Sequence, residues 1–189
     1  GFARKIHVEA SRMIQLVNDI LQLSHLDNVS ETGATPAMET VDLLDVAREC
    51  VERQKVNARH SYISLTYLGE SAPVTGSRVL LDELCQNLCD NAIRYNRPGG
   101  KVQIITACTR DGHCTLTVKD NGIGIPKEAQ SSVFERFYRV DKSRSKATGG
   151  TGLGLAIVKH IARIHNARIK LDSVVDEGTT ITVIFETAS

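Results

Sequence analysis

Several features that this sequence lacks narrow its class. No apolar run approaches the roughly 20 residues that a helix needs to span a bilayer, and the N-terminal stretch GFARKIHVEASR has no apolar core of the kind found in signal peptides. The net charge is only +1, so the composition gives no reason to expect nucleic acid or a membrane surface as a partner. We therefore expect the chain itself to be globular and cytoplasmic.

The cysteines show no pattern of a metal site or of a disulfide framework. There are five of them, and no two stand in a CxxC arrangement. An odd number without ligand spacing argues against structural zinc and against a set of paired bridges. We therefore expect reduced, partly buried thiols at all five positions, which are Cys50, Cys85, Cys89, Cys108 and Cys114.

Common nucleotide-binding signatures are absent as well. The sequence has no GxxxxGK[ST] motif, so it has no Walker A loop. It has neither HRD nor DFG, which excludes the pattern of eukaryotic protein kinases. Any phosphate site in this chain must follow another design.

The chain is long enough for one domain with a small appendage. Residues 2–27 are predicted to form one helix, followed by a polar stretch with turn formers that is the best candidate for a linker. An apolar stripe of the kind found at a coiled-coil or bundle seam follows this helix: Ile6, Met13 and Ile20 recur every seven residues, with Ala10, Leu16 and Val17 in the alternate turns. A lone helix of this kind needs a partner to bury the stripe.

After the linker, helical and strand patterns interleave without regular βαβ units, so we assign the fold class as α+β. The predicted helices are 41–58, 77–95, 127–138 and 153–165. The predicted strands are 62–68, 101–109, 114–119, 168–175 and 179–186.

The predicted helix 77–95 carries polar residues at functional spacing. Asn87 and Asn91 are four residues apart, which places them one turn apart on one face. Their amide oxygens suit a hard cation such as magnesium, which usually bridges to phosphates. Arg94 can reach phosphate oxygens and Tyr95 can pack against a base. Ordinary surface asparagines, a solvated arginine and a core tyrosine are the alternative reading.

Two glycine-containing segments add to this pattern. The first is DNGIGI, in which Asp120 ends a predicted strand and can accept a hydrogen bond from an exocyclic amine, while Gly122 and Gly124 let the backbone approach a planar ring. The second, GGTGLGLAI, opens a predicted helix, where bare N–H groups and the helix dipole attract an anion. By itself the first segment equally describes a plain turn.

A cluster of aromatic and basic residues separates the two glycine segments. FERFYR occupies 134–139, and the polar, basic stretch 139–150 that follows is predicted to be a mobile lid whose cations pair with phosphates. A solvated surface loop is the alternative.

The order and spacing of these motifs resemble the sensor histidine kinases of two-component systems. The resemblance rests on an N box (Asn87 to Asn91), a first glycine box (120–125), an F box (134–139) and a second glycine box (149–157), with EGTT at 177–180 as a weaker last motif. It also covers LVNDILQLSHLD at 16–27, which is similar to the second helix of their dimerisation and phosphotransfer hairpin. It implies a division into hairpin helix 1–28, linker 29–39 and catalytic ATP-binding domain 40–189.

This resemblance implies a Bergerat-type fold, a mixed and mostly antiparallel sheet backed by helices, that binds ATP and magnesium. Asn91 would be the magnesium ligand, Asn87 would help to hold metal and phosphate, and Arg94 and Arg139 would contact phosphates; these four would be the catalytic residues. The remaining nucleotide-binding residues would be Tyr95, Asp120, Gly122, Gly124, Ile125, Tyr138, Gly150, Thr151, Gly152, Leu153, Gly154, Leu155 and Thr179.

One position separates this chain from hydrolytic relatives. Topoisomerase, mismatch-repair and chaperone ATPases resemble the N-box helix but carry glutamate where Asn87 stands. An amide cannot take a proton from water, so we expect phosphoryl transfer rather than efficient hydrolysis. A hydrolytic ATPase, a non-catalytic dimerising scaffold and a serine-directed kinase of the anti-sigma type remain as alternatives.

The phosphoacceptor of such kinases is missing from the sequence. It lies in a motif like H-E-x-x-x-P, and none of the six histidines here has that context; His25, on the hairpin-like helix, precedes Leu26 and Asp27. We therefore expect the acceptor helix to belong to a longer parent protein. The resemblance implies a dimeric parent anchored in the bacterial membrane, with a response regulator as partner.

Overall fold

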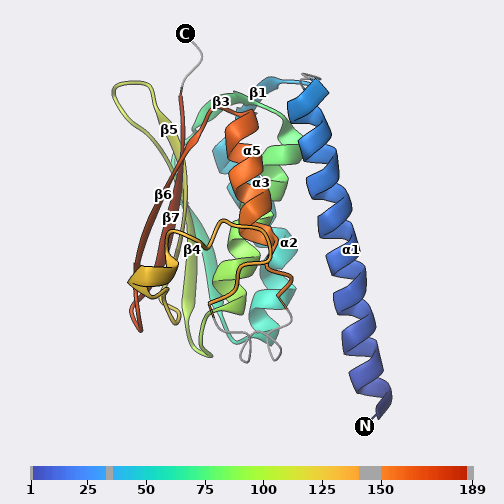
Figure 1. Cartoon of the computed structure of the whole chain (residues 1–189). Helices are drawn as coiled ribbons and strands as arrows, with labels where there is room; N and C mark the ends of the chain where they lie inside the picture. The colour runs from blue at the N-terminus through green and yellow to red at the C-terminus, as the bar shows by residue number, and fades with distance from the viewer. Residues whose placement is uncertain (1, 33–35, 141–149, 187–189) are drawn as a thin grey trace.

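In the computed structural model, a row of helices covers one face of a sheet and a long N-terminal helix stands beside that row (Figure 1). The structure describes residues 2–32, 36–140 and 150–186. The helices are α1 (Phe2–Thr32), α2 (Leu43–His60), α3 (Arg78–Arg94), the 3₁₀ helix η1 (Lys127–Ala129) and α5 (Gly154–Ile164). The strands are β1 (Glu39–Asp42), β2 (Ser64–Gly69), β3 (Pro73–Gly76), β4 (Lys101–Cys108), β5 (Cys114–Asp120), β6 (Arg168–Val174) and β7 (Gly178–Phe185).

The main sheet has the strand order β2-β4-β5-β7-β6. Only β2 and β4 run parallel; the other neighbours are antiparallel. Alternate residues along β4, β5 and β7 are buried, as expected for a sheet with one face covered. The predicted α+β class with a mixed, mostly antiparallel sheet behind helices is confirmed, and so is the long preceding helix.

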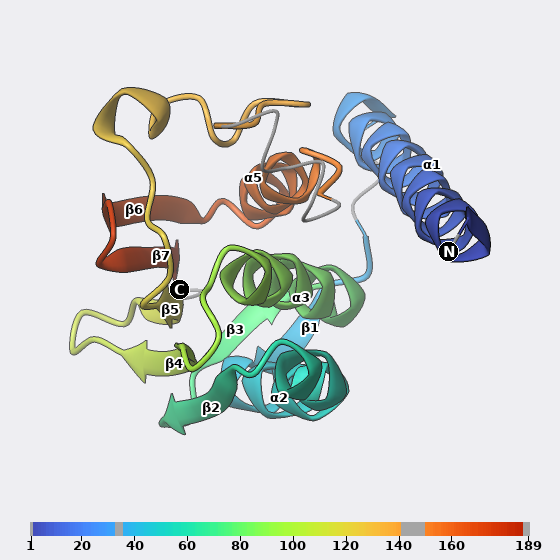
Figure 2. The ribbon, with the colours of Figure 1, turned by 90° about the horizontal axis from the view of Figure 1, so that it is seen from below.

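The core lies between this sheet and helices α2, α3 and α5, which stand side by side over it in Figure 2. Each helix turns an apolar face inward because its large side chains recur every three or four residues. Leu81, Leu84 and Leu88 of α3 and Ile157 and Ile161 of α5 are almost completely buried. This packing holds the exposed ends of α3 and α5 at fixed positions relative to the sheet.

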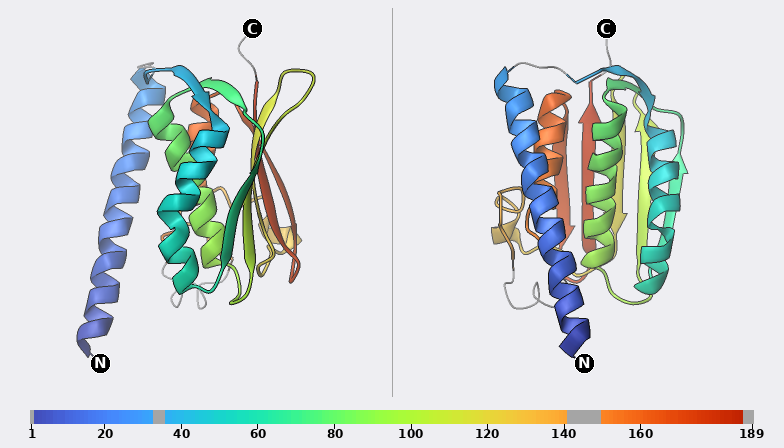
Figure 3. Two further views of the ribbon diagram at one scale, coloured as in Figure 1. Left: turned by 180° about the vertical axis from the view of Figure 1, so that it is seen from behind. Right: turned by 90° about the vertical axis from the view of Figure 1, so that its right-hand side faces the viewer.

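Helix α1 uses a different face from the one that its heptad stripe indicates. Asp19, Leu23 and Leu26 are buried against the domain, on the side that faces α5. Ile6 and Met13 of the heptad stripe are 54% and 67% exposed. Figure 3 shows α1 as a long helix that crosses the outer side of the helix layer. In the described part of the chain, no helix combines the length and apolar character needed to cross a membrane.

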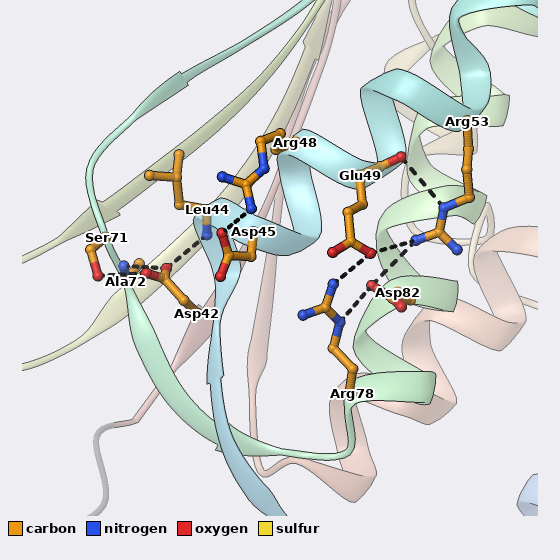
Figure 4. A network of polar contacts seen from close by, with 10 residues as sticks. All are labelled: Asp42, Leu44, Asp45, Arg48, Glu49, Arg53, Ser71, Ala72, Arg78 and Asp82. Carbon is orange, nitrogen blue, oxygen red and sulfur yellow. Dashed lines mark hydrogen bonds and ion pairs between the residues drawn. The ribbon is translucent and has the colours of Figure 1, made fainter.

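Ion pairs connect α2 to α3 on the surface (Figure 4). The Arg78 guanidinium lies 2.8 Å from Glu49 Oε2 and 3.1 Å from Asp82 Oδ1. Arg53 contacts the same two acids at 3.8 and 3.4 Å. These groups are partly solvated, so each pair contributes at most about 1 kcal/mol to stability.

The predicted helix over 127–138 is wrong. The structure has only the 3₁₀ turn η1 there, followed by turns. The Gln130 side chain donates to the carbonyls of Ile125 and Ser173, and the Phe137 N–H donates to Gly152 O at 2.9 Å. Tertiary hydrogen bonds therefore replace the helical ladder. Strands β1 and β3, which pair with each other, were not predicted.

The expectation of reduced thiols was wrong for Cys108 and Cys114, which form a disulfide. These residues face each other across the β4–β5 hairpin, with Cα atoms 4.1 Å apart. The sequence predicts the hairpin, but the pairing depends on its register. Cys50, Cys85 and Cys89 are free and buried, as expected.

Reduction of this disulfide is expected to lower the free energy of unfolding by about 2 kcal/mol, because the bridge closes a short loop in the unfolded chain. Thermal unfolding with and without reductant measures the difference. The double variant Cys108→Ser/Cys114→Ser should unfold at the temperature of the reduced protein and ignore the reductant. An unchanged midpoint for the wild-type chain would show that the bridge contributes nothing.

Candidate active site

A cavity of about 650 Å³ opens between α3, the start of α5 and one end of the sheet. It collects residues from every motif that the sequence analysis selected. The predicted site residues that line it are Asn87, Asn91, Arg94, Tyr95, Asp120, Gly124, Ile125, Tyr138, Arg139, Gly150, Thr151, Gly152, Gly154, Leu155 and Thr179. Segments that are far apart in the sequence thus meet in one concave site of the size that small-molecule ligands occupy.

Helix α3 supplies the polar wall. Asn87, Asn91 and Arg94 occupy successive turns of one face. The Asn87 side-chain N–H donates to Glu83 O at 3.0 Å, which fixes the orientation of the amide. Arg94 Nη2 donates to Asp90 Oδ2 at 2.7 Å. The Asn87 amide and the Arg94 cation are therefore held at the cavity by bonds within the helix itself.

The second glycine box lies opposite α3 and requires its glycines. A Cβ on Gly154 would stand 3.1 Å from Asn87 Oδ1, and one on Gly150 would stand 3.0 Å from the Tyr95 hydroxyl. Gly152 has φ +77°, a conformation that side chains disfavour. The absence of side chains lets the start of α5 approach α3 closely. Backbone N–H groups at this end of α5 therefore border the same cavity as the asparagines.

Asp120 provides a buried acceptor at the end of β5. Its Oδ1 accepts the N–H of Gly122 at 2.8 Å and that of Thr179 at 3.3 Å. Burial raises the pKa of this carboxyl to about 6, which the two backbone donors counteract in part. Asp120 is therefore ionised at neutral pH in an enclosed position, where an additional donor would stabilise it.

Arg139 has unsatisfied donors. Its Nε and Nη2 atoms are buried and have no hydrogen-bond partner in the described part of the chain. Buried N–H groups without an acceptor are costly, so this side chain suits an anionic ligand. The stretch 139–150 was predicted to be a lid; its residues 141–149 lie outside the described residues.

Two predicted site residues do not line the cavity. At Gly122 a Cβ would stand 2.4 Å from Tyr95 O, so this glycine lets the segment after β5 approach the end of α3 closely. Leu153 is fully buried in the core at the N-terminal end of α5. Both support residues that do line the site.

Helix α1 also contributes to the site, which was not predicted from the sequence. Gln15 and Asp19 line the cavity, and the Thr151 hydroxyl donates to Asp19 Oδ2 at 2.6 Å. A signal was present: Asp19 stands in register with Leu16, Leu23 and Leu26 on the face that packs. The more regular heptad stripe indicated that another face of α1 would pack. The apolar wall, which includes Ile123, Pro126, Val133, Val175 and Ile181, was also missed.

Comparison with known proteins identifies the class. Residues 76–189 match the family described as "Histidine kinase-, DNA gyrase B-, and HSP90-like ATPase". Because this match covers more than half of the chain, the chain belongs to that family.

The similar proteins are named as sensor kinases. The sensor-like histidine kinase SenX3 of Mycolicibacterium smegmatis is 44% identical over 187 residues, which cover 96% of this chain and 47% of that protein. The sensor protein kinase WalK of Staphylococcus saprophyticus is 38% identical over 174 residues, which cover 92% of this chain and 28% of that protein. The chain thus spans about half or less of the length of these relatives.

Solved structures agree with the fold. The mycobacterial sensor histidine kinase MprB superposes with a TM-score of 0.68 at 32% identity, covering 79% of this chain and 97% of that structure. Full-length ShkA in complex with AMPPNP superposes with a TM-score of 0.77 at 23% identity, covering 96% of this chain and 38% of that structure. The second likeness extends over α1 as well and concerns the fold alone.

Proposed function

We propose that this chain is the ATP-binding catalytic core of a protein-histidine kinase that transfers the γ-phosphoryl group of ATP to a histidine on another helix. One observation carries the proposal: the N box, both glycine boxes and the end of the F box line a single cavity. Within it, an ionised acceptor at Asp120 and the unsatisfied donors of Arg139 lie among the residues that suit the base and the phosphates of a nucleotide.

The residues fit a nucleotide with its magnesium ion. Asp120 accepts from the adenine amino group, and Tyr95, Gly124 and Ile125 border the ring. Arg94, Arg139 and the start of α5 neutralise the phosphates. Tyr138, Thr151, Leu155 and Thr179 complete the walls, whereas Gly122 and Leu153 support them without lining the cavity. Magnesium supplies charge neutralisation at the phosphates, and Asn91, with help from Asn87, would hold it through amide oxygens.

Transfer is favoured over hydrolysis by the chemistry of Asn87. It occupies the position that carries a glutamate base in the hydrolytic relatives, and its amide is already engaged with Glu83 O. In the transfer reaction an imidazole nitrogen attacks the γ-phosphorus in line, the bond to the β–γ bridging oxygen breaks, and ADP leaves. The chain's own contribution is to position the nucleotide and to neutralise its charge.

The acceptor histidine is proposed to lie on a helix outside this sequence. No histidine here has an H-E-x-x-x-P context. His160 is occupied structurally, with Nε2 3.1 Å from Leu26 O. We also propose that the chain consists of a hairpin helix (1–28), a linker (29–39) and a catalytic domain (40–189). The exposed heptad stripe of α1 supports a dimeric parent protein. The resemblance to sensor histidine kinases adds the proposals that this parent is anchored in the membrane and passes the phosphoryl group to a response-regulator aspartate.

The test is phosphoryl transfer in trans. The full chain with magnesium and γ-labelled ATP is mixed with a hairpin peptide of a similar sensor kinase that carries the acceptor histidine. We expect an acid-labile, base-stable phosphopeptide and little free phosphate. Steady phosphate release without labelling of the hairpin would favour a hydrolytic ATPase. Absence of both, with no nucleotide bound, would leave a non-catalytic scaffold.

A further inference from the structure

Helix α1 closes part of the proposed nucleotide cavity through one acidic residue. Asp19 is 6% exposed although it is charged, and it lines the cavity. Its Oδ1 accepts from Gln15 Nε2 at 2.7 Å and its Oδ2 accepts from the Thr151 hydroxyl at 2.6 Å. A residue of the second glycine box is therefore bonded directly to α1 across 132 residues of sequence.

Asp19 also adds negative charge where other acids already stand. Glu83 faces it from α3, and burial together with the Asp19 charge raises the pKa of Glu83 to about 7. The Glu83 Oε1 atom is buried without a hydrogen-bond partner in the described part of the chain. Asp90 lies on the same wall and pairs with Arg94. Docked α1 thus brings a carboxylate to the side of the cavity that carries the phosphate-binding groups.

A second contact holds α1 in place outside the cavity. Both oxygens of Asp27 accept from Arg136 Nη2, at 2.7 and 2.9 Å, and His160 Nδ1 lies 3.7 Å from Asp27 Oδ1. Neither Asp27 nor Arg136 lines the cavity. The position of α1 can therefore be disturbed at Asp27 without replacing any residue that lines the proposed nucleotide site.

We propose that docked α1 and bound nucleotide oppose each other through Asp19, so that this helix regulates access of ATP to the site. This inference rests on the proposed function. Asp19 ties up the Thr151 hydroxyl and places a negative charge beside incoming phosphates, so ATP binds more strongly when α1 is released. By linkage, bound ATP weakens the docking of α1 by the same factor.

The experiment compares matched variants by calorimetry with ATP and magnesium. Asp19→Asn removes the charge but keeps a side-chain oxygen for Thr151, and we expect about tenfold tighter binding, within the usual range of such couplings. Asp27→Ala removes the contact with Arg136 outside the cavity and so loosens α1. It should also tighten ATP binding, by a smaller factor than Asp19→Asn. Glu9→Gln makes the same change of charge at an exposed position of α1 and should leave the affinity unchanged.

Amide hydrogen exchange provides a second measurement on the wild-type chain. ATP with magnesium should accelerate exchange over the packed part of α1, residues 16–28, and Asp27→Ala should do so without nucleotide. Equal or weaker ATP binding by Asp19→Asn, or slower exchange in α1 on nucleotide binding, would overturn the inference while leaving the nucleotide site intact. Failure of every variant and of the wild type to bind ATP would instead refute the proposed function and this inference with it.

Discussion

Replacement of Asn91 by alanine is expected to weaken ATP binding in the presence of magnesium by roughly 100-fold or more, because loss of an outer partner of a metal site alone costs about 10–100-fold. Asn91 lines the cavity one turn after Asn87, and it is the residue proposed to hold the ion. The loss of ATP affinity should shrink when magnesium is chelated, because without the ion the wild type gains nothing from the Asn91 side chain as a ligand. Calorimetric titrations with and without magnesium measure both affinities.

The matched control for Asn91→Ala is Gln86→Ala. Gln86 lies on the same helix and is also a partly buried amide, but it does not line the nucleotide cavity. Its removal should leave ATP affinity within about twofold of wild type, as for surface changes in general. If the two variants bind ATP equally well, magnesium is not held by Asn91 and the assignment of the N box is wrong.

Replacement of Asp120 by asparagine is expected to weaken ATP binding by roughly 10–100-fold, the usual contribution of a hydrogen bond to a charged group. The backbone donors of Gly122 and Thr179 can still bond to the amide oxygen, so the local structure should persist. The sharper readout compares ATP with inosine triphosphate, which lacks the amino group. The wild type should prefer ATP, whereas the variant should bind both with similar affinity. A preserved preference would remove Asp120 from base recognition.

The Asp120→Asn substitution should also change the stability of the fold, in a direction that depends on pH. Burial raises the pKa of Asp120 from 3.8 to about 6 in the folded chain. The folded state therefore holds a proton more tightly than the unfolded state, and the stabilisation that results is complete below pH 3.8 and is lost as the pH rises through 6. At neutral pH the buried carboxylate thus destabilises the fold, and Asp120→Asn should leave stability unchanged or raise it. Denaturant unfolding at pH 5 and pH 8 tests this sign.

Binding and stability should therefore depend on pH in opposite directions at Asp120. ATP affinity of the wild type should decline as the pH falls through about 6, because the protonated carboxyl accepts less well from the adenine amine. The ATP affinity of Asp120→Asn should not show this decline near pH 6. Subtracting the variant's pH curve from that of the wild type removes the contributions of other titrating groups. Parallel curves for wild type and variant would contradict the role given to this carboxyl.

Much of the cavity wall could be predicted because its residues belong to short motifs whose spacing determines their arrangement. The four-residue spacing of Asn87 and Asn91 fixes a shared face on any helix, and glycines such as Gly152 are needed wherever the backbone adopts positive φ. Helices α2, α3 and α5 and the strands of the main sheet follow from apolar periodicity in the same way. The mixed, mostly antiparallel character of the sheet came from the resemblance, and its strand order was not predicted, since periodicity does not identify strand neighbours.

The errors arose where tertiary contacts override local preference. Residues 127–138 contain helix formers, yet Gln130 and Phe137 bond to distant backbone groups and the helix does not form. The Cys108–Cys114 bridge depends on the strand register, which a cysteine count does not reveal. Asp19 stands in register with apolar residues of α1, but its place in the site depends on which face of α1 packs against the domain. Each case needs information about which surfaces meet.

The most direct test of the central claim is a calorimetric titration of the unmodified chain with ATP, with and without magnesium. The cavity at the junction of α3, α5 and the sheet predicts one nucleotide per chain, bound with magnesium and much more weakly without it. Stoichiometric binding of this kind would establish the site on which the kinase proposal depends. A folded chain that takes up no ATP at any magnesium concentration would contradict the assignment of this cavity as a nucleotide site.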